Sequence, residues 1–336
     1  MNQPELTVIK STKEWDKFVD SSPFGHPQQL SAWAKLKQRN GWESVRVGVV
    51  NGGSIVAGAQ ILLLKAPVIG YTIAYIPRGP LFATDKSVSE SDLLNSLGEI
   101  ARAHGATLLK IEPALQQLDL PVGWRVAKRQ ILHPKTSVIQ LKSSSEEEIL
   151  NSFHKDARYS IRRATRNGVE IREVKSVEEI AVMWEVYQST SDRAGFNLYS
   201  FDYYKKVFTY LGEHTKVWLA YHEGKPAGFA WTAHVNNVAV YLYGGSNELG
   251  RKQLANYLLQ WEVIRYYKQA GVEYYDLNGH INDGVGSFKT KFAQEQVEYV
   301  GTYDLPLHPV MYALGESVLP RLAPLLRQAK SILRRG

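Results

Sequence analysis

Two stretches of the chain consist of paired hydrophobic runs around a short polar turn. They are residues 47–58 (VGVVNGGSIVAG) and residues 217–228 (VWLAYHEGKPAG). In each stretch, runs rich in β-branched or aromatic residues flank a turn of Asn-Gly or Glu-Gly-Lys-Pro composition, which is typical of a β-hairpin. The pattern predicts one hairpin in each half of the chain.

The signals around these hairpins also recur in one order, 165 or 166 residues apart. They are the helix starts at 9–11 and 174–176, the strand ends at 75–80 and 241–246, the helix ends at Gly105 and Gly271, and the strands at 107–111 and 273–277. Glycine suits a left-handed helix cap at both helix ends. Because the spacing is nearly constant, it favours internal duplication over a coincidence between two α+β domains.

The repeated order of helix, antiparallel strands, helix and strand is the outline of an acetyltransferase domain. We therefore predict an α+β fold with two tandem acetyltransferase-like (GNAT-type) domains, whose mixed sheets are flanked by helices. The predicted bounds are 1–143 for the first domain, 144–305 for the second, and 306–336 for an amphipathic C-terminal helical segment.

Composition narrows the class of protein. The 336 residues are 44% hydrophobic and 22% charged, as in a soluble globular protein. The chain has no cysteine, which excludes disulfides, thiolate metal sites and a cysteine nucleophile. No secretory signal pattern opens the sequence, and the hydrophobic stretch 55–76 contains Gln60, Lys65 and Pro67, so it predicts strands and no membrane span. We expect a cytoplasmic protein.

The net charge of +7 favours polyanionic partners such as nucleic acid, nucleotide phosphates or an anionic membrane surface, without choosing among them. Arg158, Arg162 and Arg166 are spaced i, i+4, i+8 on a predicted helix and form one basic stripe. Such a stripe either contacts phosphates or is simply a solvated helix face.

Four short segments stand out by their order and spacing. They are residues 28–37 (QQLSAWAKLK), 75–80 (YIPRGP), 158–164 with 190–196 (RYSIRRA, TSDRAGF), and 241–246 with 275–279 and 288–289 (YLYGGS, YDLNG, FK). Together they resemble the Fem family of peptidoglycan bridge (non-ribosomal peptidyl) aminoacyltransferases over nearly the whole chain. Some members carry a long charged coiled-coil arm, but this sequence has no such heptad run and resembles an armless form.

The resemblance implies transfer of glycine, alanine or serine from aminoacyl-tRNA to the stem-peptide amine of lipid II or UDP-MurNAc-pentapeptide. It also implies that the C-terminal segment returns to the first domain, and it implies no cofactor and no metal. An aminoacyl ester is already activated, so the enzyme must supply alignment, oxyanion stabilisation and proton removal. The chemistry requires no covalent intermediate, in agreement with the absence of cysteine.

By the same resemblance, Lys289 matches the family's cleft lysine and is the candidate for stabilising the oxyanion or a phosphate at the tRNA end, with Phe288 beside it. Lys37 and Arg193 match positions that hold the precursor's diphosphate, a ligand suited to a point charge and a planar donor fork. The remaining substrate-binding candidates are Trp33, Tyr241, Tyr243 and Glu112, and the tRNA-binding candidates are Arg158, Arg162 and Arg166. For proton removal, the spacing of Glu112, Asp276 and His280 singles out none of the three as a general base.

Two other functions compete with this reading. An acetyl-CoA N-acyltransferase normally has a glycine-rich turn that cradles pyrophosphate, whereas residues 249–256 contain a single glycine. A non-enzymatic RNA- or membrane-binding module explains the charge, but it does not explain the duplicated acyltransferase pattern. Within residues 318–335, apolar and basic positions interleave. This segment either packs on the first domain or makes reversible contact with the inner face of the plasma membrane.

Overall fold

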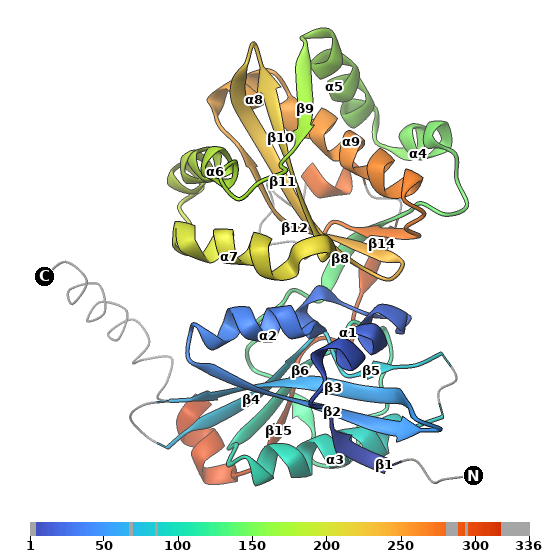
Figure 1. Ribbon diagram of the computed structural model, residues 1–336, viewed down its shortest axis with the longest axis vertical. Helices are drawn as coiled ribbons and strands as arrows, with labels where there is room; N and C mark the ends of the chain where they lie inside the picture. Colours follow the sequence, from blue (N-terminus) through green and yellow to red (C-terminus); the bar gives the residue numbers. More distant parts are fainter. Residues whose placement is uncertain (1–4, 67–69, 85–86, 280–287, 293–294, 317–336) are drawn as a thin grey trace, which may run out of the picture.

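The structure is a computed structural model that describes residues 5–66, 70–84, 87–279, 288–292 and 295–316. It contains two mixed β-sheets, one above the other in Figure 1, and helices flank both of them. The predicted α+β class is therefore confirmed.

The first sheet is built around the first predicted hairpin. β2 (Trp42–Asn51) and β3 (Ser54–Lys65) pair antiparallel around a turn in which Gly52 and Gly53 have positive φ. The order of strands is β1 (Glu5–Val8), β2, β3, β4 (Thr72–Pro77), β6 (Leu108–Glu112), β15 (Tyr303–Pro306) and β7 (Arg125–Val126), with β5 (Leu81–Phe82) also paired to β3. β4 and β6 are parallel, and the other pairs are antiparallel.

The second sheet repeats this order around the second predicted hairpin. β10 (Thr215–His222) and β11 (Lys225–Val235) flank the turn at Gly224, which has φ 71°. The order is β9 (Val169–Glu173), β10, β11, β12 (Val238–Ser246), β13 (Tyr274–Asp276), β8 (Lys135–Gln140) and β14 (Glu295–Glu298). Again one pair, β12 and β13, is parallel and occupies the position of β4 and β6.

The two sheets exchange one strand. β8 comes from the first half of the chain but lies between β13 and β14, whereas β15 comes from the second half and lies between β6 and β7. Both occupy the sixth position of their sheets, and Lys135 and Tyr303 at their starts are 168 residues apart, close to the repeat distance. They are therefore equivalent strands in exchanged places. The domain bounds 1–143, 144–305 and 306–336 stay a prediction. They differ from the sheets at these two strands, because β8 pairs within the second sheet and β15 within the first.

Helices cover the outer faces of the sheets and fill the space between them. Serine side chains cap four helix N-termini, and at Ser145 the reciprocal bond from Glu148 completes a capping box. The helices include α1 (Thr12–Ser21), η1 (Pro27–Gln29), α2 (Ser31–Gln38), α3 (Glu90–Ala103), α4 (Glu146–Ser152), α5 (Lys155–Arg166), α6 (Ile180–Ala194), α7 (Phe201–Leu211), η2 (Gly212–His214), α8 (Glu248–Lys252) and α9 (Ala255–Gln269). The predicted helix ends at Gly105 and Gly271 are confirmed, since both glycines have positive φ.

One apolar cluster joins the two domains. It contains Trp15 and Leu36 from helices of the first domain together with Tyr204 and Trp231 from the second. α2 packs against α7, and both lie between the two sheets in Figure 1. Separate clusters lie under α3 in the first domain and under α5 and α9 in the second. α2, which carries Trp33 and Lys37, and α6, which carries Arg193, therefore both pack on the apolar cluster that joins the domains.

Candidate active site

Lys289 is a buried lysine without a carboxylate bonded to it among the described residues. Only 4% of its surface is exposed. Its Nζ donates hydrogen bonds to the backbone carbonyls of Asn278 (3.0 Å) and Gly279 (2.7 Å). Burial lowers the pKa of Lys289 from 10.5 to about 8, and the charge of Asp276 opposes this shift. A protonated Lys289 has three N–H donors, and two of them are used by acceptors among the described residues, which leave one donor for a ligand.

The lysine lies where two parallel strands separate. β12 pairs with β13 only over Val238–Val240, and beyond Val240 it continues to Ser246 with β11 as its strand partner. In the described part of the chain, no strand covers the other edge of β12 after Val240. Nζ of Lys289 lies 6.0 Å from the ring centre of Tyr241, the first residue of this uncovered stretch. Backbone N–H groups along such an edge are available to a bound acyl group.

A bulge in β12 separates Tyr241 from Tyr243. The register with β11 shifts by one residue at Leu242. In a regular strand, residues i and i+2 share a face, whereas here Tyr241 packs against the cluster under α5 and α9 and Tyr243 against the cluster between the sheets. Of the two tyrosines, Tyr241 lies beside Lys289. Tyr243 packs edge-on to Tyr204 with ring centres 5.5 Å apart.

Phe288 anchors the backbone that carries Lys289. Its ring centre lies 5.1 Å from that of Tyr257 on α9 and 5.3 Å from that of Phe292. A phenyl ring supplies neither charge nor proton, so its contribution to a reaction is to hold the lysine in place. The catalytic assignment of Phe288 stays a prediction.

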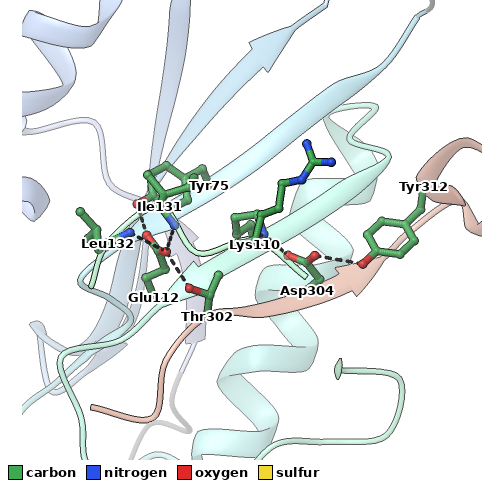
Figure 2. Close-up of polar contacts among 9 residues, drawn as sticks. Tyr75, Lys110, Glu112, Ile131, Leu132, Thr302, Asp304 and Tyr312 are labelled. Carbon is green, nitrogen blue, oxygen red and sulfur yellow. Dashed lines mark hydrogen bonds and ion pairs between the residues drawn. The ribbon is translucent and has the colours of Figure 1, made fainter. Parts of the chain in front are cut away.

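Glu112 ends β6 as a fully hydrogen-bonded carboxylate with 2% of its residue surface exposed. Figure 2 shows the donors that surround it: the hydroxyls of Tyr75 and Thr302 and the backbone amides of Ile131 (2.7 Å) and Leu132 (2.9 Å). Three of these donors bond Oε1, and the Tyr75 hydroxyl bonds Oε2. This arrangement favours a structural role, and the assignment of Glu112 to substrate binding stays a prediction.

Asp276 is the last residue of β13, as Glu112 is the last residue of β6. It accepts hydrogen bonds from the Thr136 hydroxyl, from the Asn278 amide (2.6 Å) and from the Tyr299 hydroxyl (3.3 Å). With these acceptor sites filled and 6% of its surface exposed, Asp276 is poorly placed to take a proton from a substrate. The third candidate base, His280, lies outside the described residues.

Trp33 and Lys37 lie one turn apart on α2. The Lys37 ammonium is 5.2 Å from the ring centre of Trp33, which is buried, so the lysine lies over an aromatic floor. Desolvation lowers the pKa of Lys37. Arg193 is exposed near the end of α6, before the left-handed cap at Gly195. The role of Lys37 and Arg193 in diphosphate binding stays a prediction.

The arginine stripe on α5 divides into two parts. Arg158 donates to the carbonyls of Asn151 (2.7 Å) and Phe153 (2.6 Å), and it thereby closes the end of α4. Arg162 and Arg166 are exposed. Among the described residues, neither of these two arginines closes a helix end as Arg158 does. The binding of tRNA by all three arginines stays a prediction.

The described residues contain neither a metal-binding cluster nor a membrane-spanning helix. No group of three or more histidines or carboxylates there could hold a metal ion. Likewise, none of the helices in the described ranges has the length and apolar character needed to cross a membrane.

Sequence reasoning missed Thr136 and Tyr299, and it quoted Arg78 only as part of a motif. The Arg78 guanidinium lies 5.0 Å from the ring centre of Tyr299. A signal for Thr136 existed: Thr136 and Thr302 are 166 residues apart, and each donates its hydroxyl to the carboxylate that ends the neighbouring parallel strand. An alignment of the two halves would have paired them.

The arrangement of the two sheets places the protein among tandem acetyltransferase-like folds. The chain is similar to a solved structure of FemX, with a TM-score of 0.83, 22% identity, and coverage of 92% of this chain and 99% of that chain. It is also similar to a tandem GNAT protein from the clavulanic acid biosynthesis pathway, with a TM-score of 0.54, 12% identity, and coverage of 91% and 99%. The predicted tandem GNAT-type fold is confirmed.

The FemAB family matches residues 10–120, 127–225 and 231–318, and the chain belongs to this family. The resemblance found in the sequence is thereby confirmed. A curated relative, lipid II:glycine glycyltransferase of Staphylococcus aureus (strain MRSA252), is 26% identical over 405 aligned residues, which cover 93% of this chain and 95% of that protein. Since this chain has 336 residues, the relative contains segments without a counterpart here, in agreement with the armless form.

Proposed function

We propose that this chain is an aminoacyltransferase that builds the interpeptide bridge of peptidoglycan. It moves an amino acid from aminoacyl-tRNA to the stem-peptide amine of lipid II or of UDP-MurNAc-pentapeptide. Membership of the FemAB family and relatives that are named glycyltransferases support acyl transfer to a cell-wall precursor. Glycine is the first amino acid to test for the same reason.

The observation that carries the proposal is the buried Lys289 at the open edge of β12. In the proposed reaction the amine attacks the ester carbonyl, a C–N bond forms, and the C–O bond to the tRNA ribose breaks. The amine loses a proton and the ribose oxygen gains one. Negative charge develops on the carbonyl oxygen, and the remaining N–H of protonated Lys289 can donate to it. With a pKa of about 8, Lys289 is mostly charged at neutral pH.

The other candidates fit the two substrates of this reaction. Lys37 and Arg193 are proposed to hold the diphosphate of the precursor, with Trp33 forming the floor under Lys37. Arg162 and Arg166 are proposed to contact the tRNA backbone, because they are exposed on one face of α5.

The turn between β12 and α8 weakens the acetyl-CoA alternative. A CoA enzyme presents unpaired helix N-terminal amides to the pyrophosphate. Here the side chain of Asn247 already accepts from the Gly250 amide (3.0 Å), and Glu248 adds a negative charge in the first turn.

One reconstitution separates these functions. The purified chain is incubated with lipid II or UDP-MurNAc-pentapeptide and, in separate reactions, with glycyl-, alanyl- or seryl-tRNA or acetyl-CoA. Mass spectrometry should detect one added residue with a charged tRNA and no acetylation with acetyl-CoA. Acetylation without aminoacylation would replace the proposal with the CoA function, and no product from any charged tRNA with either acceptor would contradict it.

Contact with the membrane through residues 306–336 is part of the proposal. Residues 309–316 are helical and Tyr312 is buried against Tyr71 and Leu108 of the first domain, whereas residues 317–336 lie outside the described part. Flotation with anionic vesicles should be lost when residues 325–336 are removed, while activity on a soluble acceptor remains. Unchanged flotation would contradict membrane contact.

A further inference from the structure

The loop after β13 forms a clamp around Lys289. Asn278 adopts a left-handed conformation with φ 62°, and its amide donates to Oδ1 of Asp276 at 2.6 Å. The Gly279 amide in turn donates to the Asn278 side chain at 2.8 Å. The carbonyls of Asn278 and Gly279 then accept both bonds from Nζ of Lys289. The position of the lysine therefore depends on the backbone that Asp276 holds.

Asp276 is itself held by segments that cross between the sheets. Thr136, which donates to Oδ1, arrives on the exchanged strand β8. Tyr299, which donates to Oδ2 at 3.3 Å, lies between β14 and the exchanged strand β15. The guanidinium of Arg78, from the first domain and 4% exposed, lies over the Tyr299 ring. A continuous series of contacts thus leads from the first domain to Asp276.

We propose that Asp276 is a positioning residue for Lys289. It holds the carbonyl clamp and supplies negative charge near the ammonium, with support from the first domain through Tyr299 and Arg78. The inference rests on the proposed function for its effect on transfer and deepens it. Its effect on Lys289 itself can be measured without any reaction.

Among the residues that the structure describes, few titratable groups compete with Asp276 for this role. Tyr241 on β12 faces the ammonium at 6.0 Å from its ring centre, and burial raises the pKa of its hydroxyl, so it is neutral over the working range. The Tyr299 hydroxyl donates to Asp276, Arg78 lies over the Tyr299 ring, and desolvation raises the pKa of Tyr299. Among the described residues, the carboxylate of Asp276 is the charge that favours protonated Lys289.

Two substitutions separate the charge of Asp276 from its shape. Asp276→Asn keeps an oxygen acceptor for Thr136 and Asn278 but removes the charge, and Asp276→Ala removes both. The protonation of Lys289 is read from its ¹³Cε resonance, assigned by the loss of that signal in Lys289→Met. Asp276→Asn should move the Lys289 titration about one pH unit lower. In the pH profile of kcat, the loss of activity at alkaline pH should move to lower pH by the same amount. KM for the precursor should stay unchanged.

Asp276→Ala should lower kcat about 100-fold, because the clamp that orients the lysine is lost. Tyr299→Phe is the second variant in case Asp276→Asn does not fold. It keeps the ring under Arg78 but removes a donor from the carboxylate. The carboxylate charge is then less neutralised, so the Lys289 titration should move to higher pH, opposite to the effect of Asp276→Asn.

Thr136→Val and Thr302→Val form a matched pair for the control. Each removes one hydroxyl from a buried carboxylate, but only Thr136 contacts Asp276. Thr136→Val should move the Lys289 titration, and Thr302→Val should leave it in place. An unchanged titration in Asp276→Asn, or equal shifts in both threonine variants, would overturn the positioning role. If the titration shifts as expected but no charged tRNA supports transfer, the proposed function fails and the positioning role stands.

Discussion

In the described part of the chain, each domain contains one deeply buried lysine, and the two lysines have different hydrogen-bond partners. Lys110, on β6 of the first domain, pairs with Oδ1 of Asp304 at 2.6 Å and also donates to the Arg129 carbonyl at 3.2 Å. Asp304 also accepts from the hydroxyl of Tyr312 at 3.0 Å, as Figure 2 shows. Lys289 of the second domain donates to two backbone carbonyls instead.

The surroundings of the two lysines explain this difference. In the first domain the parallel strands β4 and β6 stay paired to their ends, through Pro77 and Glu112, and Lys110 ties the exchanged strand β15 to β6. In the second domain β12 separates from β13 after Val240, and Lys289 lies at the opening. One copy of the duplicated fold is therefore closed around an ion pair, while in the other the described residues give the buried ammonium two backbone acceptors and no carboxylate partner.

The largest expected effect comes from breaking the ion pair. Lys110→Met should reduce the free energy of unfolding by about 3–5 kcal/mol, because it leaves the Asp304 carboxylate buried without its partner. Chemical denaturation at pH 7 measures the loss. Tyr312→Phe is a milder companion that removes a single hydrogen bond from the same carboxylate. A loss below about 1 kcal/mol for Lys110→Met would show that the pair does not hold β15 in place.

The corresponding change in the second domain should affect transfer and not folding. Lys289→Met should lower kcat about 10²–10³-fold, or about 2.7–4 kcal/mol, as expected for the loss of one oxyanion donor. Precursor affinity should stay close to that of the wild type, because the charge acts mainly on the transition state. Steady-state transfer and precursor binding are measured on the same preparation. Unchanged transfer by a folded variant would remove Lys289 from the mechanism.

The pH dependence of stability distinguishes the two lysines further. Lys289 has a pKa of about 8 in the folded protein against 10.5 in the unfolded chain. Between these values the unfolded state binds more protons, so the free energy of unfolding rises with pH. Wild type should gain up to about 3 kcal/mol relative to Lys289→Met between pH 7 and pH 10.5. Parallel denaturation curves at these pH values test this, and a constant difference would mean that Lys289 is not desolvated.

Local patterns in the sequence were sufficient to predict the hairpins and the repeat. Turn composition identified the β2–β3 and β10–β11 hairpins because two-strand units form between neighbours in sequence. Resemblance, and not spacing, singled out Lys289. The sequence alone does not distinguish it from Lys110, since the type of partner that each lysine meets is decided by tertiary packing.

The exchange of β8 and β15 could not be predicted from local patterns. Each is a short strand of four to six residues that would fit the same position in either sheet, so the choice depends on long-range pairing. The bulge at Leu242 is equally hidden, because it follows from the register between β11 and β12. Both features decide which side chains surround Lys289: the exchange brings Thr136 to Asp276, and the bulge places Tyr241 beside the ammonium.

The smallest expected effects concern basic residues at the domain boundary, which are less buried than either lysine. Lys37→Ala and Arg193→Ala should each weaken binding of the precursor by about 1.5–3 kcal/mol, the range for a charge-assisted hydrogen bond to a diphosphate. The exposed Arg193 should give the lower value and the stronger dependence on salt. Lys35→Ala is the matched control on the same helix, because Lys35 lies over the Tyr210 ring at 4.4 Å and has no assigned ligand. Calorimetric titration with UDP-MurNAc-pentapeptide gives the affinities. Equal losses for Lys35 and Lys37 would indicate a general charge effect, and unchanged binding in both Lys37→Ala and Arg193→Ala would place the diphosphate elsewhere.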